Sequence, residues 1–360
     1  MKPAAGVDPA LFWGIVATAV VGAAGVVVAI VLYRRSASRQ QVQALKQQID
    51  AIARRMGVTP YLAELAAART SVREPFQKGM ASIGQQKWDA AIAYFESALP
   101  AANGAELVAL FNLIGICHYT TGRHEKALAA YDESGRLARL FKDKRGEAVA
   151  VGNIGVISLA NREWDRALSS FQQALSAFEE LDARHEQARA LGNIGFVLMQ
   201  KGELDRALTY QEQALAIDRQ IDRPAGIAKR LGNIGLIWQS KGDYNKTLQF
   251  FEEALAIDRQ IGNRIGVAQD LCGIGLALEK MGRHGEAVNP LVQALRMFRE
   301  MAVAEGPGDC LTGLASCLAT LGAEGLTARC VESGMPPEEA RSLVQVLEQR
   351  STPAGTGSER

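Results

Sequence analysis

The sequence predicts an all-α fold, an α-solenoid of stacked helix-turn-helix repeats that follows a single membrane-spanning helix. Three observations carry this prediction: a long apolar stretch near the amino terminus, glycines that recur every forty residues, and apolar residues with helical spacing around those glycines. The 360 residues include 40 Lys and Arg against 39 Asp and Glu, and 48% of them are hydrophobic. Disordered chains and basic nucleic-acid-binding proteins do not show this balance, so we expect no nucleic-acid partner.

The first predicted element is the uncharged stretch from Leu11 to Tyr33. At about 1.5 Å per residue, this stretch is long enough to cross the hydrocarbon core of a bilayer, which is about 30 Å thick. Arg34 and Arg35 follow directly, where a signal peptide would have its cleavage site, so an uncleaved transmembrane helix is expected over 11–33. Lys and Arg are concentrated after the span. This asymmetry predicts that residues 1–10 lie outside and the remainder lies in the cytoplasm, with a bacterial inner membrane as the expected location.

Residues 34–71 are predicted to form a juxtamembrane helical linker. Its apolar residues follow a heptad pattern at Val42, Leu45, Ile49, Ile52 and Met56. Within the preceding span, Gly14, Thr18 and Gly22 have the spacing that lets two membrane helices approach closely. Two interpretations remain open: these features join two copies into a homodimer, or the small residues are ordinary components of a membrane helix and the linker is a spacer or packs on the next domain.

The central part of the chain is a repeat with a period of forty residues. Its marker glycines are Gly115, Gly155, Gly195, Gly235 and Gly275. Seven residues after most of these glycines comes a second glycine, for which Arg162 is the exception, and this residue is expected to close the first helix in a left-handed conformation. A glycine inside a helix costs about 1 kcal/mol relative to alanine. Its repeated use predicts that the backbones of the paired helices touch there.

The internal pattern of each unit resembles the tetratricopeptide repeat. In one unit the matching positions are Leu191, Gly195, Leu198, Gly202, Ala207 and Ala214. The forty-residue period is longer than the usual one of about 34 residues and resembles the Pins/LGN and kinesin-light-chain branch. The resemblance implies a tandem array over 72–335, with about six repeats and a degenerate seventh. A capping helix is expected over 336–350, and a disordered tail over 351–360.

Such arrays use the first helices of their repeats to line a concave groove, so we expect the candidate binding residues there. The apolar floor is predicted to include Val156, Phe196, Met199 and Leu236, with Gln239 farther along and Arg189 and Lys229 as basic contacts. The recurring Asn153, Asn193 and Asn233 resemble the asparagine ladder of this family. Two alternatives stay open: the apolar residues pack against the neighbouring repeat, and each asparagine bonds only to the adjacent repeat's backbone.

These observations predict a membrane-anchored adaptor or scaffold that binds protein or peptide partners in the groove. The alternative is a regulatory or sensor subunit of a membrane complex that binds a signalling peptide. No phosphate-binding loop, nucleophile elbow or metal-ligand spacing is present in the sequence, so no enzymatic activity, no catalytic residues, no metal and no cofactor are expected. The five cysteines include no Cys-x-x-Cys pair and are interpreted as small core residues.

Overall fold

The structure, a computed structural model, describes residues 70–301 and 306–351 and contains only helices over these ranges. The predicted transmembrane helix over 11–33 and the juxtamembrane linker, except for its last two residues, lie outside the described residues. The all-α prediction is confirmed. The described chain divides into two units, one ending at Glu186 and the other beginning at Gln187, and each is described by itself.

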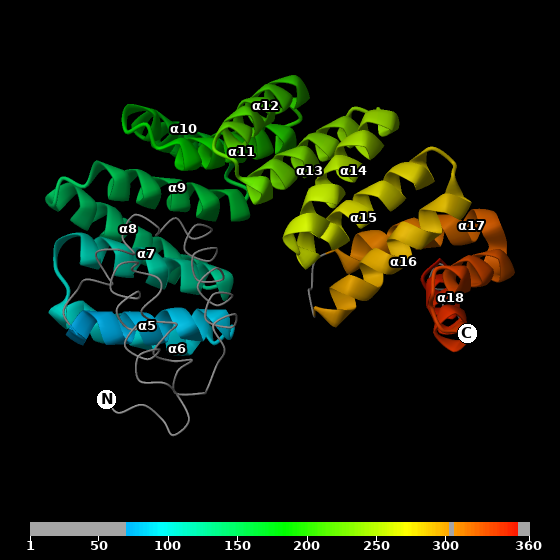
Figure 1. The fold of residues 1–360 in the computed structure, drawn as a ribbon, viewed down its shortest axis with the longest axis horizontal. Helices are drawn as coiled ribbons and strands as arrows, with labels where there is room; N and C mark the ends of the chain where they lie inside the picture. Colours follow the sequence, from blue (N-terminus) through cyan, green and yellow to red (C-terminus); the bar gives the residue numbers. More distant parts are fainter. Residues whose placement is uncertain (1–69, 302–305, 352–360) are drawn as a thin grey trace, which may run out of the picture. The chain divides into compact units, whose positions relative to one another are not determined.

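Unit 1 holds three complete helix pairs and the first turn of a fourth (Figure 1). The pairs are α5 (Thr70–Gly84) with α6 (Trp88–Ala98), α7 (Gly104–Thr120) with α8 (His124–Leu140), and α9 (Lys144–Ala160) with α10 (Trp164–Glu180). A short 3-10 helix, η1 (Leu99–Ala101), follows α6. Helix α11 (Arg184–Gln200) begins in unit 1 and continues into unit 2.

Unit 2 continues the same arrangement. After α11 come α12 (Leu204–Gln220), α13 (Pro224–Ser240) with α14 (Tyr244–Ile261), α15 (Arg264–Lys280) with α16 (His284–Glu300), α17 (Pro307–Glu332) and α18 (Pro337–Ser351). Each helix packs mainly on its neighbours along the chain, and the first helices α13, α15 and α17 also contact one another in turn. Buried side chains of α14 to α18 form one continuous hydrophobic core.

The turns within the pairs have the geometry that the sequence predicts. Gly202 and Gly242 have φ angles of 79° and 78°, in the left-handed region. Arg162 occupies the same place with a φ of 60°, although it carries a Cβ. The following residue then starts the next helix: the side chain of Asp243 accepts a hydrogen bond from the backbone N–H of Lys246 at 3.1 Å and caps α14.

The marker glycines have a different role from the one predicted, because mainly side chains lie against them. A large residue sixteen positions later packs onto each glycine: a Cβ on Gly115 would lie 2.5 Å from the ring of Tyr131, and one on Gly155 would lie 2.9 Å from Phe171. Direct backbone approach is limited to places such as Gly195, where a Cβ would lie 3.0 Å from the carbonyl oxygen of Ala207. The glycine therefore creates a recess that the second helix fills with a side chain.

Helix α17 is the one described helix that is long and apolar enough to cross a membrane, by length and composition alone. The membrane helix predicted from the sequence lies only at the amino terminus, so this second candidate was not predicted. The backbone of α17 is broken at Gly322, where φ is 71° and ψ is 171°. Leu314, Cys317 and Leu326 on both sides of this break are buried in the same core as α15 and α16. This packing is that of a core element at the end of the array.

Candidate functional site

The predicted apolar residues Val156, Phe196, Met199 and Leu236 each keep part of their surface accessible. In unit 2, Phe196 is half-buried, and Leu236 has 36% of its surface exposed, whereas the residues directly before and after each are buried. Val156 of unit 1 is half-buried in the same repeat position. We name the unit 2 surface the first-helix face, and it consists of Arg189, Asn193, Phe196, Met199, Lys229, Asn233, Leu236 and Gln239.

The polar members of the first-helix face differ in accessibility. Lys229 is exposed, while Arg189 and Gln239 are half-buried, as is the apolar Met199. Residues 189 and 229 both lie in the amino-terminal half of their helices, α11 and α13. The face thus combines apolar side chains with cationic ones, a composition suited to a partner with apolar and acidic groups.

Two of the three predicted asparagines have partners on other helices. Asn153 donates a hydrogen bond from Nδ2 to Oδ1 of Asn112 on α7 at 2.5 Å, and it is buried. Asn233 donates to Oε1 of Gln211 on α12 at 3.4 Å. These partners are side-chain oxygens, so the alternative of a bond to the neighbouring backbone does not describe them. Asn193 is half-buried on α11.

Gln211 is a polar residue where the other repeats are apolar. The equivalent positions, which pack on the marker glycines, hold Phe95, Tyr131, Phe171, Phe251 and Leu291. The buried Gln211 side chain donates from Nε2 to the carbonyl oxygen of Gly192 at 2.8 Å and accepts from Asn233. It therefore ties together α11, α12 and α13 below the first-helix face. A glutamine at a position that is aromatic or leucine in the other repeats is visible in the sequence and could have indicated this polar contact.

A buried ion pair between α12 and α13 lies near Gln211, and it was not predicted from the sequence either. Arg230 on α13 is only 2% exposed, and its Nε donates to Oδ2 of Asp218 on α12 at 3.3 Å. Arg223 lies 2.7 Å from the other oxygen of Asp218. Burial lowers the pKa of Arg230 to about 10, against the opposing attraction of Asp218, so the guanidinium remains charged at neutral pH. Its side chain occupies the space that a side chain at Gly192 would fill.

The next repeat has an acid in the same position. Asp270 on α15 is buried against Gly232, as Arg230 is against Gly192. Burial, together with the negative charge of Asp258 on α14, raises the pKa of Asp270 to about 8. Its Oδ2 atom has no hydrogen-bond partner among the described residues. The repeats that begin with α13 and α15 therefore differ in the ionisable group that each buries at this position: an arginine in the first and an aspartate in the second.

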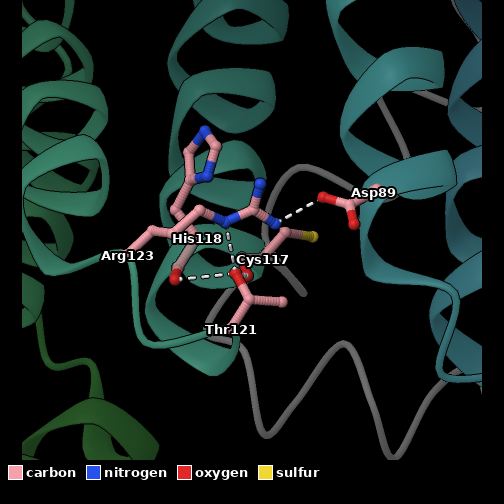
Figure 2. A network of polar contacts seen from close by, with 5 residues as sticks. All are labelled: Asp89, Cys117, His118, Thr121 and Arg123. Atoms are coloured by element: carbon pink, nitrogen blue, oxygen red, sulfur yellow. Dashed lines mark hydrogen bonds and ion pairs between the residues drawn. The ribbon is translucent and has the colours of Figure 1, made fainter.

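A further polar network lies in unit 1, at the carboxyl-terminal end of α7 (Figure 2). Arg123 forms an ion pair of 2.5 Å with Asp89 on α6 and donates from Nε to Oγ1 of Thr121 at 2.8 Å. Thr121 in turn donates to the carbonyl oxygens of Cys117 and His118 at 2.9 and 3.0 Å. The bonds from Thr121 satisfy carbonyl groups in the last turn of α7. The ion pair connects the turn after α7 to the first turn of α6, and it lies at the surface because Asp89 is 81% exposed.

Burial shifts the pKa of two titratable groups in this network, Cys117 and His118. Burial raises the pKa of the Cys117 thiol to about 12, which leaves it protonated and weakly nucleophilic. Burial, with the nearby Arg123, lowers the pKa of His118. A hollow between α9 and α10 is lined by Lys144, Glu147, Ala148, Val151, Gln173 and Ala177, which include none of the predicted site residues. Over the described ranges, no group of three or more His, Cys, Asp or Glu residues could hold a metal ion.

Comparison with protein families identifies the repeats. Two family models, both described as tetratricopeptide repeat, match this chain, one at residues 146–220 and 227–300 and the other at residues 76–138. Together they cover more than half of the chain. No curated protein matches the sequence.

Several solved structures share the fold at low sequence identity. Aspartyl phosphate phosphatase F from Bacillus subtilis is 17% identical, with a TM-score of 0.58 over 91% of this chain and 79% of that one. A Rap protein complexed with competence and sporulation factor is 15% identical, with a TM-score of 0.56 over 95% of both chains. The Rap conjugation gene regulator of the plasmid pLS20, in complex with the Phr* peptide, is 14% identical, with a TM-score of 0.55 over 82% of this chain and 76% of that one.

Proposed function

Because the chain belongs to the tetratricopeptide-repeat family, we propose that it is a membrane-anchored adaptor whose first-helix face binds a protein or peptide partner. The observation that carries this proposal is the accessible apolar row on α11 and α13, with Leu236 at 36% exposure beside buried neighbours. A partner that covers Phe196 and Leu236 would remove apolar surface from water. Arg189 and Lys229 would orient acidic groups of the partner at the same face.

The proposed adaptor acts without catalysis of its own. Although one of the similar folds is named a phosphatase, that name belongs to a protein of 17% identity and does not identify a reacting group in this chain. The first-helix face consists of apolar, amide and cationic side chains, which provide contacts for a partner and include no nucleophile paired with a base. Arg189, Asn193, Phe196, Met199, Lys229, Asn233, Leu236 and Gln239 form the proposed binding set, with Val156 and Asn153 as their equivalents in unit 1.

A regulatory or sensor subunit is the second candidate function. Two of the structures with the same fold are complexes, one with competence and sporulation factor and the other with the Phr* peptide, so a peptide ligand is present on this fold in the second protein. A signalling peptide on the first-helix face would shift the melting temperature of the array. A passive scaffold bound to a permanent partner would show no such response to a free peptide.

The membrane part of the proposal rests on the apolar stretch from Leu11 to Tyr33 and the arginines after it. We propose a cytoplasmic array beside a bacterial inner membrane, with homodimerisation through the span and linker as a further element. The forty-residue period favours the Pins/LGN and kinesin-light-chain branch within the family.

Capture of partners by the full-length protein, purified from its native membrane in detergent, tests the proposed face. Once a co-purifying protein is identified by mass spectrometry, its Kd for the full-length chain is measured before and after Leu236→Glu. The introduced charge should weaken binding at least tenfold, because it would be desolvated beneath the partner.

Leu181→Glu is the matched control. Leu181 is a leucine of similar exposure, 39%, that follows α10 outside the first-helix face. Circular dichroism establishes that both variants stay folded. Equal binding by Leu236→Glu and the unmodified chain, or equal weakening by both variants, would show that the partner binds elsewhere.

A further inference from the structure

In unit 2, each first helix contacts the next one at the same repeat position, and the side chains that meet there differ in type at each of the three contacts. Arg230 lies against Gly192, and Asp270 lies against Gly232, in each case with a separation of 38 residues. The same separation joins Cys272 on α15 to Cys310 on α17, and here the two sulfur atoms face each other at 3.2 Å. Cys272 stands where the preceding repeats carry Gly152, Gly192 and Gly232.

The distance between these sulfurs is close to what a covalent bond requires. A disulfide has an S–S length of about 2.05 Å, so the two atoms must approach by about 1.2 Å. Rotation about the single Cα–Cβ bond moves each sulfur, and both side chains belong to the same hydrophobic core. The other three cysteines, Cys117, Cys317 and Cys330, have no comparable sulfur contact among the described residues.

We infer that Cys272 and Cys310 are an oxidation site, at which a small diffusible peroxide converts the two thiols into a disulfide that links α15 to α17. Cys272 reacts first because 6% of it is exposed, whereas Cys310 is fully buried. Its sulfur attacks one oxygen of hydrogen peroxide, the O–O bond breaks, and a sulfenic acid and one water form. The Cys310 thiol then attacks the sulfenic sulfur, the S–O bond breaks, and a second water leaves with the remaining proton.

The same burial determines the rate and the selectivity of this reaction. The hydrogen bond that Cys272 shares with Cys310, together with burial, raises the pKa of Cys272 well above its usual range. Because the thiolate is the reacting form, oxidation is slow. Once a sulfenic acid forms, however, its nearest sulfur is Cys310, so the disulfide is favoured over mixed products with small thiols. Large oxidants are excluded by the packing around Cys310.

The expected consequence is a stabilised end of unit 2. The bond would close a loop that contains all of α16, which reduces the conformational freedom of the unfolded chain. It would also hold α17, the last first-helix of the array, at a fixed position on α15. This inference concerns the packing between α15 and α17 and stands independently of the partner proposed above.

Exposure of the full-length protein to hydrogen peroxide under native conditions tests the site. Remaining thiols are alkylated, and disulfides are mapped by mass spectrometry after chymotryptic digestion, because trypsin leaves Cys310 and Cys317 on one peptide whereas Leu311 and Leu314 lie between them. The expected product is the Cys272–Cys310 crosslink, with Cys117, Cys317 and Cys330 still alkylated. The melting temperature should rise by several degrees on oxidation and return on reduction.

Two variants separate this reaction from general oxidation. Cys272→Gly restores the residue that three earlier repeats carry at this position and should abolish both the crosslink and the shift in melting temperature. Cys317→Ser should retain both. A crosslink that forms only in denaturant, or one that joins Cys310 to Cys317 or Cys330 as often as to Cys272, would overturn the inference.

Discussion

Arg230 on α13 and Asp270 on α15 occupy equivalent positions in consecutive repeats, yet one buries a guanidinium and the other a carboxyl group against equivalent glycines, Gly192 and Gly232. Asp218 pairs with the arginine. The aspartate instead has the carboxylate of Asp258 near it, and its Oδ2 atom has no partner among the described residues. Two consecutive repeats therefore depend differently on pH.

The buried acid predicts a loss of stability as pH rises. The folded-state pKa of Asp270 is raised to about 8 from the ordinary 3.8, so the folded chain holds a proton that the unfolded chain releases. The free energy of unfolding should decrease as the pH increases from about 4 to about 8. Asp270→Asn, which has no such proton, should flatten this part of the profile and stabilise unit 2 at pH 8. Urea denaturation of both proteins at pH 5, 7 and 8.5 measures the difference, and parallel profiles would contradict it.

The buried ion pair predicts a large cost when only one partner is removed. Arg230→Ala leaves Asp218 in the core with Arg223 alone and opens a cavity, so the free energy of unfolding should decrease by about 3–5 kcal/mol. The double variant Asp218→Ala with Arg230→Ala should cost less than the sum of the two single changes, because neither of the two fully buried charges of the pair is left without the other. Denaturant melts of the four proteins give the coupling energy. Additive effects would show that the pair does not interact.

Two glycines of α9 provide a matched test of the recess that the second helix fills. A Cβ on Gly155 would lie 2.9 Å from the ring of Phe171, which is fully packed, whereas a Cβ on Gly152 would lie 3.7 Å from Ala174. Gly155→Ala should therefore destabilise unit 1 by about 1–3 kcal/mol. Gly152→Ala should leave stability unchanged or raise it by up to about 1 kcal/mol, because alanine favours the helix. Thermal melts decide between these expectations, and equal effects would argue against the recess.

Arg162 predicts a stabilising substitution. It has a φ of 60° at a turn where Gly122, Gly202, Gly242 and Gly282 have similar left-handed angles. Arg162→Gly should relieve the steric cost of its Cβ and raise stability by about 0.5–1 kcal/mol, after the greater freedom of glycine in the unfolded chain is subtracted. Arg166→Gly, inside helix α10, is the control and should be destabilising by about 1 kcal/mol. A decrease in melting temperature for both would contradict the assignment of strain to Arg162.

The local features of this protein could be predicted from its sequence because they depend on residues within a few positions of one another. Helices, their capping and left-handed turns follow from apolar spacing and from residues such as Gly202 and Asp243. Phe196 and Leu236, which the same spacing places beside the packing stripe, keep part of their surface accessible. The recess at each marker glycine could not be predicted in this way, because it is filled by a side chain sixteen residues away on another helix.

Apolar spacing and turn residues along the chain are enough to place the helices and to pair them into repeats. They do not reveal which equivalent positions meet across successive repeats: Arg230 with Gly192, Asp270 with Gly232 and Cys310 with Cys272. The physical reason is that a helix is stabilised by contacts three and four residues apart, whereas contacts 38 residues apart depend on how far each repeat rotates and slides as it packs on the one before.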